Sequence, residues 1–213
     1  MRRCQTGLSL VELMIGLALG LFISAAGFAA FAEQWREHRH ATLAMRLQQD
    51  LRRLAELVAR DLRRAGYWAA PAASRPNPYA AFAPQAAASD AASYAYSRDA
   101  IENHSLDSAE QFGLRLRRGV IELQLGAGGW QALTDAGTLV VTEFLLEPRL
   151  QSVSLLEHCA RPCPAGVACD AHVNVRRLAL RITARAASDA SLVRRIDTLV
   201  RLRNDEVAGA CPA

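Results

Sequence analysis

The sequence predicts an α+β protein, in which one long N-terminal helix precedes an antiparallel β-sheet that packs on it. Two patterns lead to this fold class. Apolar residues at helical spacing extend as far as Gly66, and beyond residue 110 apolar and polar residues alternate with the period of a β-strand. With 213 residues, 51% of them hydrophobic, the chain can form the core of one medium-sized domain behind an N-terminal appendage.

The first part of the helix is predicted to span a membrane. Residues 13–32 are 20 positions without a charge, about the length that a helix needs to cross a bilayer core of ~30 Å. A cleaved secretory signal has a shorter apolar region followed by a small-residue cleavage site, and residues 33–35 offer no such site. Because Arg2 and Arg3 precede the run, we expect the N-terminus in the cytoplasm and the rest of the chain across the membrane.

One acidic residue, Glu12, interrupts the apolar character near the start of this run. The stretch that contains it, GLSLVE at residues 7–12, resembles the processing site of type IV prepilins. The resemblance implies that a prepilin peptidase cleaves the bond between Gly7 and Leu8 on the cytoplasmic side. The same enzyme methylates the new N-terminus at Leu8 in that family.

The chemistry of Glu12 agrees with this resemblance. An isolated carboxylate at bilayer depth costs roughly 2.5–3.5 kcal/mol on insertion scales. Cleavage creates an α-amine at Leu8, and in a bundle of such helices we expect Glu12 of one subunit to neutralise the amine of another. That pairing would also fix the axial register between the helices. A carboxylate that simply reaches the water interface is the alternative explanation.

The helix is predicted to continue beyond the membrane as an amphipathic segment, residues 33–66. This segment contains no Pro and no Gly before Gly66, where a helix commonly ends. Its apolar residues recur about every 3.7 positions and form one stripe: Leu43, Leu47, Leu51, Leu54, Val58, Leu62 and Ala65. The stripe needs a partner. We expect it to be the sheet of the same chain, and a coiled-coil dimer is the alternative.

The residues at the end of this helix indicate a particular group within the type IV pilins. Residues 61–68, DLRRAGYW, are similar to the helix exit of PilW-type minor pilins of type IV pili. Two features depart from many major pilins: Leu8 stands where they have Phe, and no Pro precedes Pro71. Gly16 and Gly20 have the spacing of a close helix-packing motif, although a helix that simply tolerates glycine is the alternative.

The predicted organisation is a leader, a two-part helix, a loop and a head. The leader is residues 1–7, and residues 8–32 form the helix of the membrane and filament core. Residues 67–110 are rich in Ala, Pro and Ser, show no period, and are predicted to be a long loop. Residues 111–213 are predicted to be an antiparallel β-sheet head, with strands at 112–117, 121–125, 130–133, 138–146, 178–183 and 196–202.

Five cysteines are present, and Cys4 lies in the predicted leader. The other four form an even set in an extracytoplasmic head, which indicates two disulfides: Cys159, Cys163, Cys169 and Cys211. Of the three connectivities we favour Cys211 bonded to one of the clustered three, while the other two close a local loop. A metal site with His158 and His172 is the alternative, but the cysteine spacings lack the paired C-x-x-C units of common zinc sites. We therefore predict neither a metal nor a cofactor.

The predicted role is mechanical. The sequence has no phosphate-binding loop, nucleophile elbow or zinc-protease motif, so we expect neither an enzyme nor a small-molecule substrate. The resemblance implies a minor pilin that serves the assembly or initiation of a type IV pilus. It would be anchored in the inner membrane, with its head in the periplasm, and then reach the pilus and the cell surface. Its expected partners are prepilin peptidase, other minor pilins and the major pilin.

Three other classes remain as alternatives. The stretch VRLRN at residues 200–204 also resembles PulJ-like minor pseudopilins of type II secretion systems. A minor pilin used in DNA uptake would need a contiguous arginine face, but without Arg2 and Arg3 the chain has 23 arginines against 21 acids, which argues against nucleic acid. The third class is a membrane-anchored enzyme or binding domain in which the leader match is a coincidence.

Overall fold

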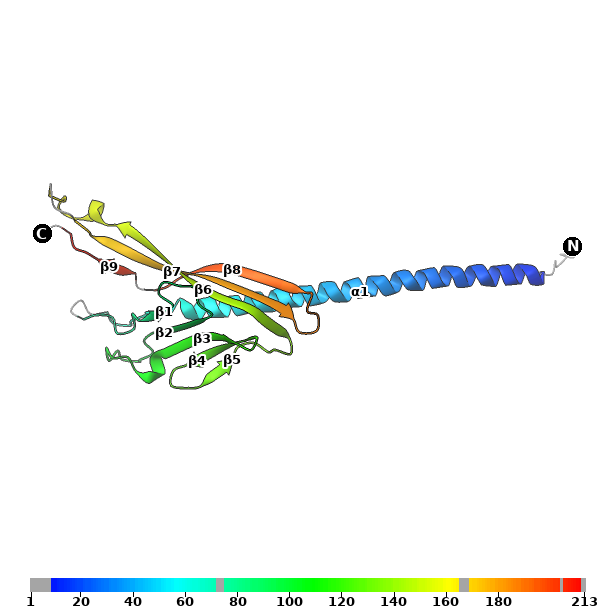
Figure 1. Cartoon of the computed structure of the whole chain (residues 1–213), viewed down its shortest axis with the longest axis horizontal. Coiled ribbons are helices and arrows are strands. Elements are labelled where there is room, and N and C mark those ends of the chain that lie inside the picture. Colours follow the sequence, from blue (N-terminus) through cyan, green and yellow to red (C-terminus); the bar gives the residue numbers. More distant parts are fainter. Residues whose placement is uncertain (1–8, 72–74, 165–168, 204, 212–213) are drawn as a thin grey trace, which may run out of the picture. The chain divides into compact units, whose positions relative to one another are not determined.

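Figure 1 shows the computed structural model of the chain, which describes residues 9–71, 75–164, 169–203 and 205–211. The chain divides into two compact units, Met1–Arg46 and Leu47–Ala213. One long helix followed by antiparallel strands confirms the predicted α+β class. The elements are α1 (Leu10–Leu62), β1 (Phe82–Ala83), β2 (Ala91–Ala95), η1 (Ser108–Glu110), β3 (Gln111–Arg117), β4 (Val120–Leu125), β5 (Trp130–Ala132), β6 (Leu139–Ser154), η2 (Leu156–His158), β7 (His172–Ala186), β8 (Val193–Arg201) and β9 (Glu206–Ala208).

In the first unit, the apolar side chains of α1 are exposed. Phe22 and Phe28 are each 75% accessible, and Leu13 is 62% accessible. Among the described residues, α1 is the one helix that is long and apolar enough, by length and composition, to cross a membrane. Apolar surface of this extent is stable against lipid or against other protein helices, and not in water.

In the second unit, the predicted apolar stripe of α1 is buried. Leu51 and Leu62 have no exposed surface, and Val58 is 1% exposed. The buried set follows the helical period and also contains two small residues that sequence reasoning left out of the stripe, Ala55 and Ala59. The amphipathic half of the helix is therefore the central element of the core, as the period of about 3.7 residues indicates.

The α-helix ends at Leu62, four residues before the predicted glycine, and a turn at residues 63–66 follows it. The backbone N–H groups of Arg64 and Ala65 donate to carbonyl groups three residues earlier, at 3.0 and 3.1 Å, which tightens the last turn. Gly66 has a φ of +78°, a conformation that side chains disfavour, and its N–H donates to the Ala95 carbonyl at 2.8 Å. The helix exit is thereby fixed to the end of β2.

The head contains two antiparallel sheets, where we expected one. The first has the strand order β1-β2-β3-β4-β5, and the second places β7 between β6 and β8, with β9 paired to the other end of β7 (Figure 1). A β-bridge between Ser89 and Leu146 connects the two sheets. The inner faces contribute most of the core, with Phe112, Leu114, Ile121, Phe144, Leu146, Leu178, Leu180, Ile182 and Val200 buried.

The six strands predicted in residues 111–213 are present as β3 to β8, β6 and β7 extend much further than predicted, and β9 was not predicted. The β3–β4 hairpin turns at Arg118 and Gly119, which both have positive φ, as the common two-residue hairpin turn requires. Strand β6 continues to Ser154, and β7 begins at His172. A bulge between Val141 and Glu143 shifts the alternation of β6 by one residue, so that buried positions before and after it have different parity.

The prediction of a single long loop at residues 67–110 is wrong. This segment contains β1, β2 and η1, and β2 lies inside the first sheet, between β1 and β3. The sequence of β2 is AASYA, in which small residues conceal the alternation. Its buried positions Ala92 and Tyr94 are 4% and 3% exposed. Pairing with β3 stabilises a segment whose own β-propensity is weak.

A partly buried polar cluster joins the helix exit to β2. The Tyr94 hydroxyl donates to the Asp61 carboxylate, and the Tyr96 hydroxyl lies 3.4 Å from the other oxygen of Asp61. The Arg64 guanidinium lies over the Tyr96 ring, 4.7 Å from its centroid. Burial, together with the charge of Asp61, raises the pKa of Tyr94 well above its usual range, and burial raises the pKa of Tyr96 to about 12. Both hydroxyls therefore remain protonated donors at neutral pH.

Truncation of the buried stripe should destabilise the second unit strongly. We expect Leu51→Ala to lower the free energy of unfolding by about 2–5 kcal/mol, because it removes a fully buried side chain and leaves a cavity. The matched control is Leu57→Ala on the same helix, where the leucine is 43% exposed and the loss should be well under half as large. Urea unfolding of the full chain in detergent micelles, followed by circular dichroism, measures both. Equal losses would contradict the assigned helix face.

Candidate processing and assembly site

Glu12 lies in the first turn of α1, in the exposed apolar segment of the first unit. One of its carboxylate oxygens accepts a hydrogen bond from the Ser9 backbone N–H at 3.2 Å. The Ser9 carbonyl in turn accepts from the Leu13 N–H at 3.1 Å and begins the helical ladder. A carboxylate at this end of a helix is favoured by the helix dipole, so Glu12 helps to define where the helix begins.

The carboxylate of Glu12 retains free hydrogen-bonding capacity. A carboxylate has about four acceptor sites, and the Ser9 N–H occupies one of them. No cation pairs with Glu12 in the part of the chain that the structure describes, and residues 13–32 that follow it are uncharged. The geometry therefore leaves this group able to bind a positive charge from outside the described residues. Gly7 and Leu8, the predicted cleavage positions, lie outside those residues.

The glycines of the apolar segment are not needed by the fold of this chain. A Cβ atom built at Gly16, Gly20 or Gly27 meets nothing within 4 Å, apart from the neighbouring helix backbone. The Ser24 hydroxyl donates to the Gly20 carbonyl at 2.7 Å, so it is satisfied within the helix. This helix face is open, and the predicted close packing at Gly16 and Gly20 stays a prediction.

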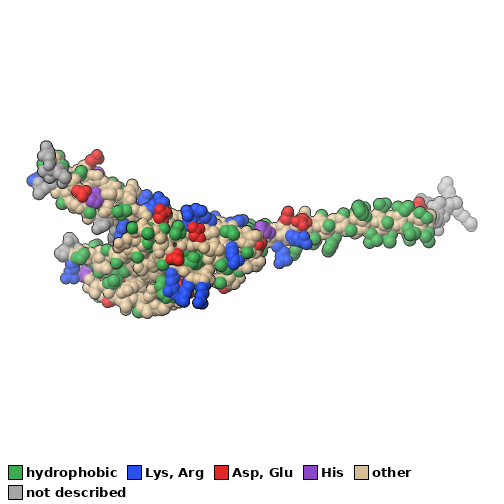
Figure 2. Space-filling view, viewed as in Figure 1, with side chains coloured by type: hydrophobic (Ala, Val, Ile, Leu, Met, Phe, Trp, Pro, Cys, Tyr) green, Lys and Arg blue, Asp and Glu red, His purple; other side chains and the backbone are tan. Residues whose placement is uncertain are grey.

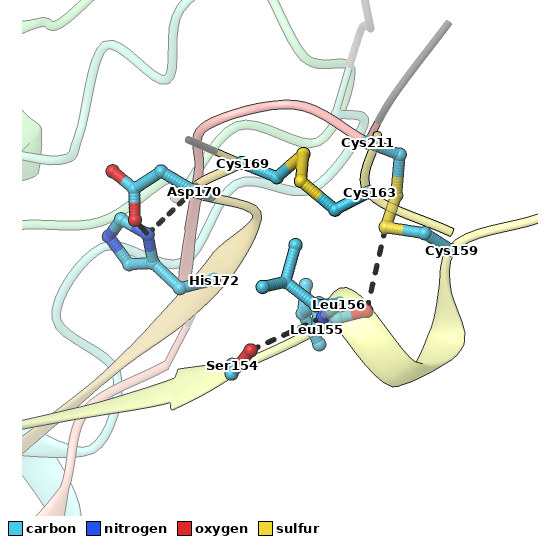
Figure 3. Close-up of a disulfide and its surroundings, with 9 residues drawn as sticks. All are labelled: Ser154, Leu155, Leu156, Cys159, Cys163, Cys169, Asp170, His172 and Cys211. Carbon is cyan, nitrogen blue, oxygen red and sulfur yellow. Dashed lines mark hydrogen bonds and ion pairs between the residues drawn. A yellow bond between two sulfur atoms is a disulfide. The ribbon is translucent and has the colours of Figure 1, made fainter. Parts of the chain in front are cut away.

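The four cysteines of the head form two disulfides at the end of the β6–β7 ribbon (Figure 3). Cys159 is bonded to Cys211 across a separation of 52 residues, and Cys163 is bonded to Cys169 across a separation of 6. Two disulfides are present as predicted, and the partner of Cys211, which the sequence left open among the three clustered cysteines, is Cys159. The first bond ties the C-terminal segment to the connection that follows β6, and the second closes a local loop.

The disulfides also bear on the alternative of a metal site. Because all four sulfurs are bonded in pairs, they provide no thiolate ligand. The imidazole of His172 lies 3.0 Å from the Asp170 carboxylate, and His158 is in η2 (Figure 3 shows the first pair). These histidines lie near the disulfides without a thiolate partner for a shared ion.

Sequence reasoning missed one group of carboxylates. One oxygen each of Asp99, Asp107 and Glu110 lies within 4.8 Å of the others, and Glu110 is 1% exposed. Backbone N–H groups of Arg98 and Asp107 donate to the two oxygens of Glu110, at 2.8 and 3.0 Å. The burial of Glu110 is thus explained by its closing of the loop. The D-x-x-E spacing of a capping box is the sequence signal that could have found it.

Two family models match the chain. The family described as prepilin peptidase-dependent protein B matches residues 40–202. The chain belongs to this family. The prokaryotic N-terminal methylation motif matches residues 2–28, which include Gly7, Leu8 and Glu12. No curated protein and no solved structure matches the chain.

Membership in the prepilin peptidase-dependent protein B family supports a type IV pilin-like minor pilin that is processed at its N-terminus. The family match covers the amphipathic half of α1 and most of the head, and the motif match covers the predicted cleavage positions. The apolar helix and the motif are together consistent with a membrane anchor. The narrower resemblance to PilW stays a prediction.

Removal of the longer disulfide should destabilise the head more than removal of the shorter one. In the chain-entropy estimate, a bond across 52 residues contributes about 4 kcal/mol and a bond across 6 residues about 2 kcal/mol. We therefore expect Cys159→Ala/Cys211→Ala to lose about twice the unfolding free energy that Cys163→Ala/Cys169→Ala loses. Urea unfolding under non-reducing conditions measures the difference, and the opposite order would contradict the role given to the C-terminal bond.

Proposed function

We propose that the chain is a minor pilin of a type IV pilus, of the PilW kind, that is needed for pilus assembly or initiation. After processing, it is incorporated into the pilus or into a tip complex with other minor pilins. Its function is to supply contacts between subunits, and it has no catalytic activity of its own.

One observation carries this proposal. A helix with 20 uncharged residues exposes its apolar side chains, and a single carboxylate, Glu12, precedes them within a matched methylation motif. An anchor alone does not require an acid at that position, since the acid makes insertion less favourable. A cleavage at Gly7 that creates an amine at Leu8 gives the acid a partner.

The proposed sequence of events follows from the charges. The basic stub keeps the N-terminus in the cytoplasm while the helix enters the inner membrane and the head reaches the periplasm. Prepilin peptidase cleaves after Gly7 and methylates Leu8, which keeps its positive charge. Glu12 then pairs with the Leu8 amine of a neighbouring pilin, so that neither charge stays alone in an apolar bundle. The head is free for contacts with other minor pilins and the major pilin.

The disulfides support the proposed location of the head. Bonds of this kind form and persist in the periplasm and at the cell surface, and rarely in the cytoplasm. A head that stayed in the cytoplasm would meet reducing conditions. The two bonds are therefore expected in a head that has crossed the inner membrane.

A minor pseudopilin of a type II secretion system is the alternative within the same class, because the same processing and the same helix serve both systems. Deletion of the gene separates them. We expect loss of surface pili and of pilus-dependent motility, with protein secretion unchanged. Loss of secretion with normal piliation would overturn the proposed function in favour of the secretion system.

The arrangement of arginines does not favour a DNA-uptake pilin. Four arginines of the second sheet are bonded to acids: Arg149 with Glu147, Arg181 and Arg195 with Asp197, and Arg201 with Asp205. Figure 2 likewise shows basic and acidic side chains mixed over the second unit. A nucleic-acid surface usually has a contiguous basic patch.

Glu12→Ala should separate processing from assembly. We expect cleavage and methylation to proceed, while incorporation into filaments falls by at least about 100-fold, because a buried charge without its partner costs about 3–5 kcal/mol. Immunoblots of processed protein in membranes and in sheared pili measure the two steps. The control is Glu33→Ala on the same helix, which removes an exposed acid 3.6 Å from Arg36 and should assemble normally. Normal assembly of the Glu12 variant would show that charge neutralisation is not required.

A further inference from the structure

Strand β8 forms a free edge of the second sheet. It pairs with β7 on one side, and no other described strand pairs with it. Two hydrogen bonds mark the ends of the β7–β8 ladder. The Leu202 N–H donates to the Arg176 carbonyl, and the Ala186 N–H donates to the Leu192 carbonyl, both at 3.0 Å. Because hydrogen-bonded positions alternate in an antiparallel pair, the backbone N–H and C=O groups of the even-numbered residues of β8 point toward β7. The N–H and C=O groups of Arg195, Asp197 and Leu199 therefore point to the free edge.

A groove of about 450 Å³ lies between this edge and α1. Small residues of the helix, Ala55 and Ala59, form one side of it, and Ile196 and Thr198 of β8 form the other. Both β8 side chains point toward the helix but are only half-buried, in contrast to Val200 on the same face, which is fully buried. The core layer between sheet and helix is thus left incomplete beside the free edge.

The charges around the groove are mainly positive. Arg52, Arg60 and Arg63 line it from the helix, and among the described residues none of the three has an ion-pair partner. The acids are Glu56 and Asp197. Hydrogen bonds from Arg195 and then from Arg181, at 2.7 and 2.9 Å, lower the pKa of Asp197 to about 2. Asp197 is therefore already neutralised by other arginines, and the groove keeps an excess of positive charge.

We propose that this groove binds an extended acidic segment of another pilin-type subunit, which adds to β8 as a further strand. The backbone groups at the free edge would bind the backbone of the segment, as in other cases of strand addition. Its inward side chains would cover Ile196 and Thr198, and its carboxylates would pair with Arg60 and Arg63. That the partner is a pilin rests on the proposed function. The binding surface itself is inferred from the structure alone.

The same charges argue against a second copy of this chain at the edge. Strand β8 carries Arg194, Arg195 and Arg201 against one acid, Asp197. Two such strands side by side would bring six arginines together with two acids, and this excess of like charge disfavours their pairing. Charges on an edge strand are a common protection against self-association. A strand of opposite charge overcomes this protection, and that makes the edge selective.

The test uses the full chain in detergent micelles and two labelled probe peptides of nine residues, the length of β8. One probe alternates valine with glutamate, and the other has lysine in place of glutamate. Fluorescence anisotropy measures binding. We expect the glutamate probe to bind at least about tenfold more tightly than the lysine probe. Arg60→Glu/Arg63→Glu should abolish this preference. Equal binding of the two probes to the unaltered chain would overturn the proposal.

A second pair of variants tests strand addition itself. Leu199→Pro removes an N–H that points to the free edge and leaves the ladder with β7 intact, so we expect it to weaken binding of the glutamate probe by about tenfold or more. Leu199→Thr keeps that N–H and should bind like the unaltered chain. Equal binding by the two variants would overturn strand addition. If the proline variant fails to fold, the arginine variants with the two probes decide the proposal.

Duplex DNA, added as a competitor, tests whether the groove binds nucleic acid instead. Binding of DNA that depends on Arg60 and Arg63, but is the same in the proline and threonine variants, would assign the groove to nucleic acid and overturn the proposal. None of these measurements requires a pilus. Failure of the glutamate probe therefore overturns this surface, whereas normal piliation after gene deletion overturns the proposed function.

Discussion

A single carboxylate, Glu12, precedes the uncharged, membrane-length part of α1, and it constrains the surroundings in which this helix is stable. The helix α1 exposes apolar side chains that require lipid or neighbouring helices, and in either environment an isolated charge at Glu12 is costly. Within the described residues its carboxylate accepts only the Ser9 N–H. The methylation motif and membership in the prepilin peptidase-dependent protein B family support processing of the N-terminus. The proposed cleavage after Gly7 would create a cation four residues before Glu12. Under this proposal, anchor, cleavage site and assembly contact depend on one pairing of charges.

In the second unit, the constraint is that the remaining apolar stripe of α1 must be covered by the head. The stripe is buried by residues of two sheets, the helix exit is fixed to β2 through Gly66 and the Asp61 cluster, and the C-terminal segment is held by the Cys159–Cys211 bond. The coverage stops at β8, where Ile196 and Thr198 stay half-buried beside arginines that have no ion-pair partner among the described residues. The core layer is thus incomplete along an edge whose chemistry suits a partner strand.

Sequence reasoning succeeded where one strong period governs a segment. The helix stripe and strands β3 to β8 follow from spacing alone, and the presence of two disulfides, although not their pairing, follows from an even set of cysteines. It failed for β2, because AASYA has little β-propensity and is stabilised by pairing with β3, a contact distant in sequence. The division of the head into two sheets was likewise not predictable, because local alternation specifies strands and not which strands pair. The free edge of β8 depends on that pairing, so only the structure reveals it. The predicted cleavage site, in contrast, lies in a short contiguous motif, which matches the N-terminal methylation motif over residues 2–28, and its exact position stays a prediction.

The mature N-terminus is the most direct test of the central claim, because Glu12 has a partner amine only if the leader is removed. Mass spectrometry of the full protein purified from membranes, together with sequencing of its N-terminal peptide, measures it. The account predicts a chain that begins at Leu8 and carries a methyl group on its α-amine. A protein that retains Met1 and an intact leader in every membrane fraction would contradict the account.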